Sequence, residues 1–541
     1  MNFLKDLPVL ILGLGDSGLA MARWCARCGA QVTVWDSREQ TAGDAAIANE
    51  WPAVQRIGGE LLPSQLSGVM LVLKSPGLAP SDARVAPLLD EARAIGIAVL
   101  GELDLFVRAL ADLKAAWAYA PQLLAITGTN GKTTTTAMTA LLVARTGRRV
   151  ATAGNIGPTL LDTLNAQLAE LPAPPALPDQ AAPEDEALPE METEQAPEPK
   201  PADALPQVWV LELSSFQLEG GGTGVRGFEP AAATVLNITQ DHLDWHGTLA
   251  AYTAAKARVF GADGVMVINH DDAAVEALVP LPEPVKGKAK PKPITRTIVR
   301  FSLDAPRRPG DFGLVTEGGM AWLVRALPAD ETVKRKKGDE EEIHLQRLMP
   351  ADALRVRGRH NAANALAALA LATAIGCPLA PMLHGLRDYT GEPHRVEFIS
   401  RVGDVEAFDD SKGTNVGATV AALNGLGADK APGRLVVILG GDGKGQDFTP
   451  LREPLSRHAR AVATIGRDAA AIESVLGPVP FQRHETLEAA VAWSFEQAQA
   501  GDAVLLSPAC ASLDMFRNYT HRAEVFVQAV QAVAAERGAL A

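Results

Sequence analysis

Cysteine is scarce in this 541-residue sequence, which has only Cys25, Cys28, Cys377 and Cys510. Four cysteines so widely spread form no disulfide framework, so we expect a reducing compartment. Cys25 and Cys28 form a CxxC pair, but no second pair completes a zinc site, and both lie in a helix expected over 18–29. We interpret them as packed helix residues, with redox or metal chemistry as the alternative.

The sequence also lacks long apolar runs and an excess of positive charge. No uncharged apolar stretch reaches the roughly 18 residues of a membrane-spanning helix. The apolar run at 7–14 is short and has no cleavage site after it, which argues against a signal peptide. Lysine and arginine number 50 against 64 acidic residues, and the net charge of −14 argues against a nucleic-acid surface. We therefore expect a cytoplasmic monomer that acts on small molecules, with neither nucleic acid nor a membrane span.

Short apolar runs alternate with helical patterns along most of the chain, which is typical of parallel α/β sheets. The length suits roughly three or four domains. The strands expected from these runs lie at 9–14, 31–35, 69–74, 123–127, 208–211, 434–439, 461–465 and 503–506. The expected helices include 18–29, 133–147, 361–375 and 486–500.

Two segments interrupt this pattern. Residues 170–206 hold ten prolines and many acids, with Lys200 as the one basic residue, and such a composition cannot bury enough apolar surface to fold. We predict that this segment is disordered or extended on the surface. Within about 283–345, we interpret the basic run 286–292 and the mixed-charge block 334–342 as solvated loops that flank a hairpin, in preference to a binding patch.

The first motif that carries chemistry is a glycine-rich turn, with Gly13, Gly15 and Gly18 between an expected strand and helix. Such glycines let backbone N–H groups approach a diphosphate at a helix N-terminus. Asp36 follows at the end of the next strand, where a dinucleotide fold has its ribose-binding acid. The pattern fits NAD, FAD or another nucleotide diphosphate such as UDP. It also fits a turn without a ligand, in which the glycines only shape the backbone.

The second motif is GTNGKTT, over residues 128–134. Gly131, Lys132 and Thr133 match the end of a phosphate-binding loop, in which the lysine reaches the β- and γ-phosphates and the hydroxyl binds Mg²⁺. The general pattern requires a glycine at position 126, where this chain has Ile126, so the loop is a contracted variant. The motif predicts that the protein binds ATP.

Acids, a histidine and a lysine follow further along the chain. Glu212 comes directly after a buried strand, where a carboxylate can hold the Mg²⁺ that neutralises phosphate charge. Asp241, His242 and Asp244 lie in one short run, and Lys256 follows it. A lone histidine is more often structural. In a chain with a phosphate loop, however, a histidine with nearby acids and a lysine indicates a cluster that binds metal and substrate.

These motifs resemble those of the Mur ligase family, which joins amino acids to the UDP-linked muramoyl precursor of peptidoglycan. The resemblance rests on GTNGKTT, on GNIG at 154–157, ELSSFQLE at 212–219, NITQDHLD at 237–244, HNAAN at 360–364 and PHR at 393–395. Three further runs are similar to those of the members that add D-glutamate: DSKGTN at 410–415, GGDGK at 440–444 and SPACASLD at 507–514. Together they span nearly the whole chain apart from the two interrupting segments.

The resemblance implies an α/β fold of three domains: a Rossmann-like UDP-binding domain (1–110), a P-loop ATPase-like domain (111–390) and a Rossmann-like D-glutamate-binding domain (391–541). It also implies a ligase that uses ATP and two Mg²⁺ ions to add D-glutamate to UDP-N-acetylmuramoyl-L-alanine in peptidoglycan precursor synthesis. The substrate carboxylate would attack the γ-phosphate to give an acyl phosphate, which the amine of D-glutamate would then attack. Because the first step brings an anion to a polyanion, catalysis would consist mostly of charge neutralisation and positioning.

The resemblance assigns site residues position by position. The catalytic residues would be Lys132, His242, Lys256 and Glu212, and the metal ligands would be Thr133, Glu212, His242 and a carbamylated Lys256. ATP would contact Gly128, Thr129, Asn130, Gly131, Lys132, Thr133, Thr134, Asn364, Arg395 and Asp410. The UDP-linked substrate would contact Gly15, Asp16, Ser17, Asp36, Ser37, Arg38, Ser75, Gly77, Asn155, Ser214 and Gln217. D-Glutamate would contact Lys412, Thr414, Lys444, Ser512, Leu513 and Tyr519.

Several alternatives stay open. An unmodified Lys256 would repel a metal and would instead contact a phosphate. Asp16 would either repel the diphosphate or hydrogen-bond the uracil, and Tyr519 stands where the family tends to have Phe. The rival identities are another Mur-type ligase, a folylpolyglutamate synthase and a nucleotide-sensing protein. The first domain and the run 410–415 argue against the folate enzyme, and the sensor leaves Glu212 and Lys256 unexplained.

Overall fold

The computed structural model describes residues 2–171, 201–220, 224–281, 295–329, 342–356 and 358–538. Its chain divides into two compact units, Met1–Leu124 with Gly147–Pro230 and Ala125–Thr146 with Ala231–Ala541. Strand β6 (Gln122–Thr127) begins in the first unit and ends in the second. The acidic run 172–200 and most of the charged runs 286–292 and 334–342 lie outside the described residues.

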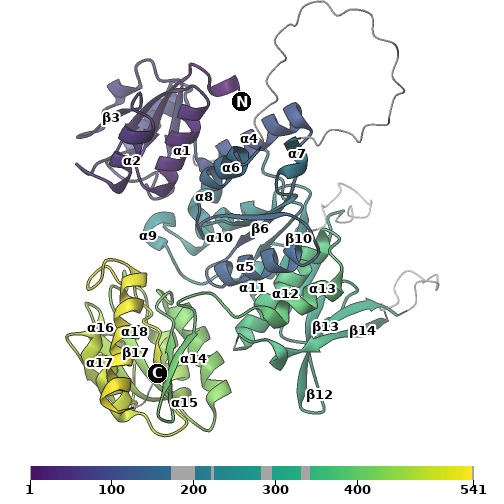
Figure 1. The fold of residues 1–541 in the computed structure, drawn as a ribbon, viewed down its shortest axis with the longest axis vertical. Coiled ribbons are helices and arrows are strands. Elements are labelled where there is room, and N and C mark those ends of the chain that lie inside the picture. The colour runs from purple at the N-terminus through teal and green to yellow at the C-terminus, as the bar shows by residue number, and fades with distance from the viewer. Residues whose placement is uncertain are drawn as a thin grey trace, which may run out of the picture. The chain divides into compact units, whose positions relative to one another are not determined.

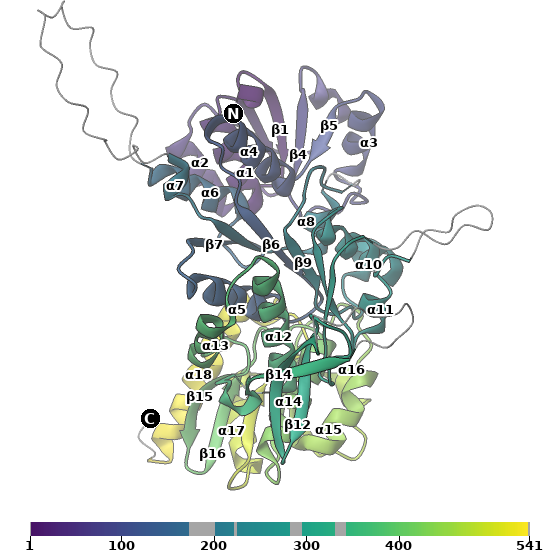
Figure 2. The same cartoon turned by 90° about the vertical axis from the view of Figure 1, so that its right-hand side faces the viewer.

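A five-stranded parallel sheet, in the order β3-β2-β1-β4-β5, forms the amino-terminal part of the first unit (Figure 1; Figure 2). Its strands are β1 (Pro8–Leu12), β2 (Gln31–Trp35), β3 (Gln55–Ile57), β4 (Leu71–Lys74) and β5 (Ala98–Leu100). The accompanying helices are η1 (Asn2–Leu4), α1 (Asp16–Arg27), α2 (Ala42–Glu50), η2 (Pro63–Leu66), α3 (Ala86–Ala94) and α4 (Glu102–Trp117). Because the central strands β1 and β4 are buried almost throughout, they consist mainly of apolar residues, as expected for inner strands of a parallel sheet.

The rest of the first unit contains β7 (Val150–Gly154) and β8 (Val208–Glu212), which pair in parallel. Its helices are α6 (Leu160–Ala169), α7 (Pro201–Ala204) and α8 (Ser215–Glu219). Helix α7 shows that the prediction of disorder was wrong for the end of the segment 170–206. Leu205 is buried there and its carbonyl accepts from Arg149 Nε at 3.1 Å, while Tyr119 donates to the Pro206 carbonyl at 2.7 Å. These contacts order the chain as it enters β8.

In the second unit, the strands that follow β6 lie in the order β9-β10-β11-β12-β13-β14. Their bounds are β9 (Ala232–Val235), β10 (Val265–Asn269), β11 (Ile298–Phe301), β12 (Phe312–Glu317), β13 (Met320–Pro328) and β14 (Ile343–Pro350). Strands β9 to β12 pair in parallel, whereas β12, β13 and β14 are antiparallel. The hairpin predicted between the two charged runs is therefore present as β12 and β13, and β14 adds a third antiparallel strand.

Helices α5 (Lys132–Ala144), α12 (Arg359–Ala374) and α13 (Leu379–Asp388) pack together in this unit (Figure 1). The others near these strands are α9 (Leu243–His246), α10 (Leu249–Ala257), η3 (Arg258–Phe260), α11 (Ala273–Glu276) and η4 (Ala351–Ala353). Across the described residues, no helix has both the length and the apolar character that crossing a bilayer requires.

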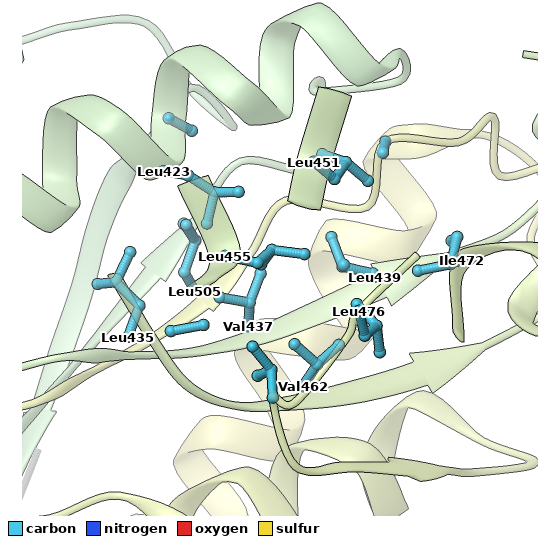
Figure 3. Close-up of a cluster of buried hydrophobic side chains, with 14 of the residues drawn as sticks. Leu423, Leu435, Val437, Leu439, Leu451, Leu455, Val462, Ile472, Leu476 and Leu505 are labelled. Carbon is cyan, nitrogen blue, oxygen red and sulfur yellow. The ribbon is translucent and has the colours of Figure 1, made fainter. Parts of the chain in front are cut away.

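A six-stranded sheet, in the order β15-β16-β20-β17-β18-β19, forms the carboxyl-terminal part of the second unit. Its strands are β15 (Glu397–Val402), β16 (Val405–Asp409), β17 (Leu435–Gly440), β18 (Ala459–Ile465), β19 (Phe481–Arg483) and β20 (Ala503–Leu506). The helices are α14 (Val416–Lys430), η5 (Thr449–Leu451), α15 (Arg452–His458), α16 (Ala469–Glu473), α17 (Leu487–Gln497) and α18 (Tyr519–Glu536). Figure 3 shows part of the core, where Leu423 of α14 packs with Val437 of β17 and Leu505 of β20.

The CxxC cysteines lie at the end of α1. Cys25 is buried inside the helix, and Cys28 follows its last residue. Burial raises the pKa of both thiols. Since the thiolate is the reactive and metal-binding form, this environment favours the packing interpretation.

Candidate nucleotide and substrate site

The phosphate-loop motif connects β6 to α5 in the second unit. Gly128 and Gly131 both have positive φ, of 151° and 81°. A Cβ on Gly131 would also lie 2.7 Å from the Asn364 amide oxygen, so this position requires glycine both for its backbone and for its neighbour. The loop ends directly at the N-terminus of α5, where backbone N–H groups favour the binding of an anion.

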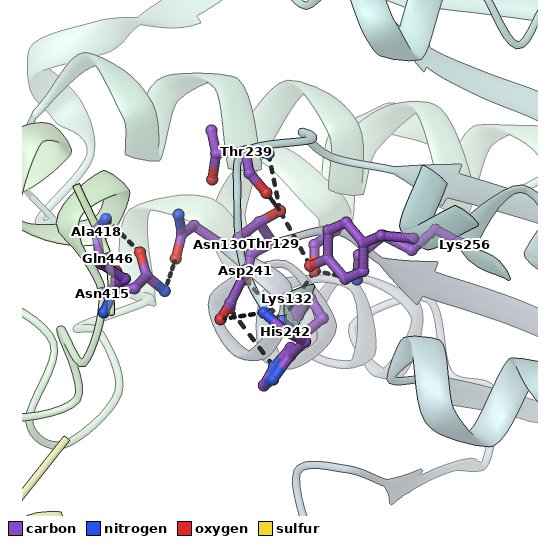
Figure 4. A network of polar contacts seen from close by, with 12 residues as sticks. Thr129, Asn130, Lys132, Thr239, Asp241, His242, Lys256, Asn415, Ala418 and Gln446 are labelled. Carbon is purple, nitrogen blue, oxygen red and sulfur yellow. Dashed lines mark hydrogen bonds and ion pairs between the residues drawn. The ribbon is translucent and has the colours of Figure 1, made fainter. Parts of the chain in front are cut away.

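A network of polar contacts holds this loop in shape (Figure 4). Asn130 and Asn237 exchange two hydrogen bonds: the Asn130 N–H donates to Asn237 Oδ1 at 2.8 Å, and Asn237 Nδ2 donates to the Asn130 carbonyl at 3.0 Å. The Thr129 hydroxyl accepts from the Thr239 N–H at 3.0 Å and lies 3.2 Å from the Tyr252 hydroxyl. The segment that follows β9 thus fixes the loop that follows β6.

Two lysines converge on the loop carbonyls. Lys132 Nζ donates to the carbonyls of Gly128 and Thr129 at 2.9 and 2.8 Å. Lys256 is only 2% exposed, donates to the Gly128 carbonyl at 2.8 Å and lies 4.6 Å from the centre of the Tyr252 ring. The structure therefore brings together the loop and the two lysines that the motifs singled out.

His242 is the N-cap residue that precedes α9, and it has a positive φ of 53°. Its Nε2 lies 3.5 Å from an Asp241 carboxylate oxygen. Burial lowers the pKa of His242, the Asp241 carboxylate opposes this, and Lys132 and Lys256 lower the pKa further. The imidazole is thereby kept neutral, which is the form that binds a metal ion.

A cavity of about 80 Å³ lies in the second unit beside the phosphate loop. Its lining includes six of the predicted ATP contacts, namely Asn130, Gly131, Thr134, Asn364, Arg395 and Asp410. His360 and Asn361, which the motif analysis quoted but did not assign, also line it. The segment around Asp410 and the phosphate loop are thus brought to one cavity although they are far apart in sequence.

Arg395 and Asp410 both line this cavity. Arg395 donates to the Thr133 hydroxyl at 2.6 Å. Asp410 accepts from the Ser507 hydroxyl at 2.6 Å, and burial raises the pKa of its carboxyl to about 7. Next to Arg395, His394 Nδ1 lies 2.7 Å from Asp409, a pairing that the sequence did not suggest.

The predicted D-glutamate contacts lie at the carboxyl ends of the last sheet. The Lys412 ammonium lies 3.8 Å from the centre of the Tyr519 ring, so Tyr519 contributes a π face to this position. Ser512 is buried, whereas Leu513 is 69% exposed. The Thr414 N–H donates to the Lys412 carbonyl at 2.8 Å, and Lys444 has a positive φ of 51°.

Arg522 is a structural residue of this region that the sequence analysis missed. It is fully buried in α18, and it donates to the Ser411 hydroxyl at 3.0 Å, the Ser411 carbonyl at 2.8 Å and the Cys510 carbonyl at 3.1 Å. Its guanidinium therefore joins the run 410–415 to the run 507–514. The sequence offered no signal for this role beyond a charged residue within an apolar helix.

The first unit contains the other predicted residues. Asn155 Nδ2 donates to Glu212 Oε1 at 2.7 Å, and Glu212 is buried at the end of β8. Its second oxygen, Oε2, has no hydrogen-bond partner among the described residues. Ser214 and Gln217 bond to each other as the N-terminal cap of α8, at 2.9 Å between the hydroxyl and Oε1. That contact gives both side chains a structural role.

The remaining predicted UDP-binding residues lie near the carboxyl ends of β1, β2 and β4. Asp36 accepts from the Leu14 N–H at 2.7 Å and from Arg38 Nε and Nη2 at 2.9 and 2.8 Å. The Arg38 guanidinium holds the pKa of Asp36 well below its usual range. The Ser75 hydroxyl donates to the Gly13 carbonyl at 3.1 Å, and Ser37 accepts from Arg84 at 3.0 Å. Asp36 thus orients the glycine loop and Arg38.

Three family models match the chain in order. The Mur ligase MurD-like N-terminal domain matches residues 8–101, the Mur ligase middle domain 126–372, and the Mur ligase glutamate ligase domain 394–510. These matches agree with an α/β fold of three domains.

The chain is also similar to full-length relatives. It is 59% identical to a UDP-N-acetylmuramoylalanine–D-glutamate ligase of Albidiferax ferrireducens, with 100% of this chain and 99% of the relative covered. It is 53% identical to the ligase of the same name from Ralstonia nicotianae, with 98% of each chain covered. Among solved structures, MurF ligase from Thermotoga maritima in complex with ADP has a TM-score of 0.55 at 13% identity, covers 99% of this chain and 100% of its own, and shares the fold. The chain is therefore a member of the Mur ligase family and belongs with its UDP-N-acetylmuramoylalanine–D-glutamate ligases.

Proposed function

We propose that the protein uses ATP to join D-glutamate to UDP-N-acetylmuramoyl-L-alanine in peptidoglycan precursor synthesis. The observation that carries this proposal is the 59% identity, over the whole chain, to a ligase of that name. The loop at 128–134, its two lysines and the cavity beside Asp410 support it, because they provide what phosphoryl transfer from ATP requires.

In the first step, an oxygen of the L-alanine carboxylate would attack the γ-phosphorus of ATP, and ADP would leave. The reaction brings a carboxylate to a polyanion, so the barrier falls when fixed cations and N–H groups face the phosphates. Lys132 and the N–H groups at the start of α5 would bind the β- and γ-phosphates. Arg395 would add a second cation beside the Thr133 hydroxyl.

Mg²⁺ would neutralise phosphate charge in this step and fix the γ-phosphate for attack. The buried Glu212 Oε2, which lacks a partner among the described residues, fits the hard oxygen ligand that this ion prefers. The Thr133 hydroxyl and the neutral imidazole of His242 would serve as further ligands of two ions.

Lys256 joins this set after carbamylation, in our proposal. As an ammonium it would repel Mg²⁺, whereas the carbamate formed with CO₂ carries a negative charge and two oxygens. Its buried position beside the Gly128 carbonyl protects such a group from water.

In the second step, the amine of D-glutamate would attack the acyl carbon, phosphate would leave and the nitrogen would release a proton. Lys412 and Lys444 would pair with the two carboxylates of D-glutamate, and the hydroxyls of Thr414 and Ser512 would donate to them.

We further propose domain boundaries at 1–110, 111–390 and 391–541, a monomeric state and a cytoplasmic location. The family models at 8–101, 126–372 and 394–510 support the boundaries. A cytoplasmic location fits an enzyme that consumes ATP.

A single assay tests the function. Purified protein receives ATP, Mg²⁺ and UDP-N-acetylmuramoyl-L-alanine, with D-glutamate, L-glutamate or L-alanine in turn, and released phosphate is measured. We expect release with D-glutamate alone. Release with another amino acid would indicate a different Mur-type ligase, and release without any amino acid or no release at all would contradict a ligase.

A further inference from the structure

A buried carboxyl in the first unit has no role in the reaction described above. Glu102 is the first residue of α4 and is only 2% exposed. Its Oε1 accepts from the Leu161 N–H at 3.0 Å, at the first turn of α6. Burial raises the pKa of Glu102, and its contacts with Leu161 and Ser17 partly offset this. Burying a carboxyl here therefore costs folding free energy, which indicates that its position serves a function.

The surroundings of the carboxyl indicate what this function is. Glu102 Oε2 is buried and has no partner of normal hydrogen-bond geometry among the described residues. Two side chains interact with the carboxyl: the Ser17 hydroxyl in the first turn of α1 and the Asp162 carboxylate in the first turn of α6. Glu102 therefore lies between the N-termini of α1 and α6.

Each of these two helices directly follows a loop of the substrate site. The loop before α1 contains Gly13 and Gly15, and the loop before α6 contains Asn155. Further along the same helices, Arg27 donates to Asn165 Oδ1 at 3.1 Å and Arg23 lies 3.5 Å from Asp162. Helices α1, α4 and α6 thus join the two loops within one compact unit.

We propose that Glu102 is a positioning residue that holds the glycine loop and the Asn155 loop in one fixed arrangement for the UDP-linked substrate. One oxygen accepts from the Leu161 N–H at the start of α6, and the Ser17 hydroxyl at the start of α1 interacts with the same carboxyl. This inference rests on the proposed function for the identity of the substrate. A core residue without this role would stabilise the unit but would leave substrate affinity unchanged.

The first test compares Glu102→Ala with Glu102→Gln in steady-state kinetics. The glutamine keeps an acceptor for the Leu161 N–H and a polar group toward Ser17, so it should stay within about threefold of wild type. The alanine variant should raise the KM for UDP-N-acetylmuramoyl-L-alanine roughly tenfold and leave the KM for ATP within about twofold, because ATP binds to the other unit. Equal rises in both KM values, or a lower melting temperature with unchanged KM, would overturn the proposal.

A matched control removes a contact between the same helices without touching the carboxyl. Arg27→Ala loses the exposed bond to Asn165, and we expect its KM values to match wild type. In a double-mutant cycle, Ser17→Ala and Glu102→Ala should be non-additive in their effect on the KM of the UDP-linked substrate. Additive effects would mean that Glu102 does not act through Ser17, which contradicts the proposal.

A further measurement uses only the wild-type protein, so its outcome does not depend on whether a variant folds. UDP alone should slow amide hydrogen exchange at Leu160–Asp162 of α6 as well as at the glycine loop, because Glu102 couples the two. Protection of the glycine loop alone would overturn the inference. Failure of the proposed function would look different, since wild type would then show no phosphate release dependent on D-glutamate.

Discussion

At the scale of single residues, Lys256 is buried to 98% and its ammonium faces the Gly128 carbonyl rather than solvent. We predict that Lys256→Ala lowers turnover roughly a hundredfold or more, because a charged group beside the phosphate loop is lost. A short carboxylic acid added to the buffer should restore part of the rate by replacing the carbamate. Phosphate release with and without the acid checks this, with exposed Lys114→Ala as the control. No restoration would leave Lys256 as a plain phosphate contact.

Asp410 gives a prediction on stability. Burial raises its pKa from 3.8 to about 7, so the folded protein keeps a proton that the unfolded chain releases between these pH values. Relative to Asp410→Asn, wild type should therefore lose stability as pH rises from 4 to 7, by on the order of 4 kcal/mol at most. Chemical unfolding of both proteins at several pH values measures this. A stability difference that stays constant from pH 4 to pH 8 would show that Asp410 is ionised throughout.

Motifs predicted those residues whose spacing along the chain is set by a local chemical requirement. Lys132 and Thr133 directly follow Gly131 at the start of α5, as the motif predicts for a loop that leads into a helix. Arg522 could not be found, because its partner Ser411 is 111 positions away and no local pattern connects them. Ser214 and Gln217 have a second feature that their spacing also predicts, a capping box, and the structure contains that cap.

At the scale of elements, two glycines with nearly the same φ allow backbone strain to be measured separately from an effect on ATP binding. Gly131 has φ +81° and a Cβ there would meet Asn364, whereas Gly147 has φ +84° with nothing within 4 Å. Gly147→Ala should cost about 1 kcal/mol of stability and leave ATP affinity unchanged. Gly131→Ala should cost at least as much and also weaken ATP binding roughly a hundredfold, because the loop must move away from Asn364. Nucleotide titration with denaturant unfolding checks both, and equal losses of affinity would contradict the role given to Gly131.

Elements were predictable where burial leaves a strong pattern. The expected strands 31–35 and 503–506 match β2 and β20. Strand β20 is a continuous buried apolar segment, and β2 has buried Val32, Val34 and Trp35. The short edge strand β19 was not predicted, since all three of its residues are exposed and carry no such pattern. Helix α7 was missed for a related reason: its order comes from contacts of Leu205 and Pro206 with distant residues, which composition does not reveal.

At the scale of the whole molecule, we predict that the activity does not depend on residues 173–200, which lie outside the described residues. The described chain on either side ends in α6 and resumes in α7, and neither helix contains a predicted site residue. Deleting 173–200 should leave turnover within a few-fold, because its composition predicts no packed core. Initial rates of the shortened and full-length proteins measure this. A loss of activity with an unchanged melting temperature would mean that the segment acts in catalysis.

The buried guanidinium of Arg522 has a consequence for biosynthesis. It belongs to α18, the last described helix, and it holds two runs that begin near residues 410 and 507. A nascent chain can therefore complete the proposed amino-acid pocket only after nearly all of it has left the ribosome. Chains that terminate before α18 would lack this anchor, so premature termination should yield inactive protein.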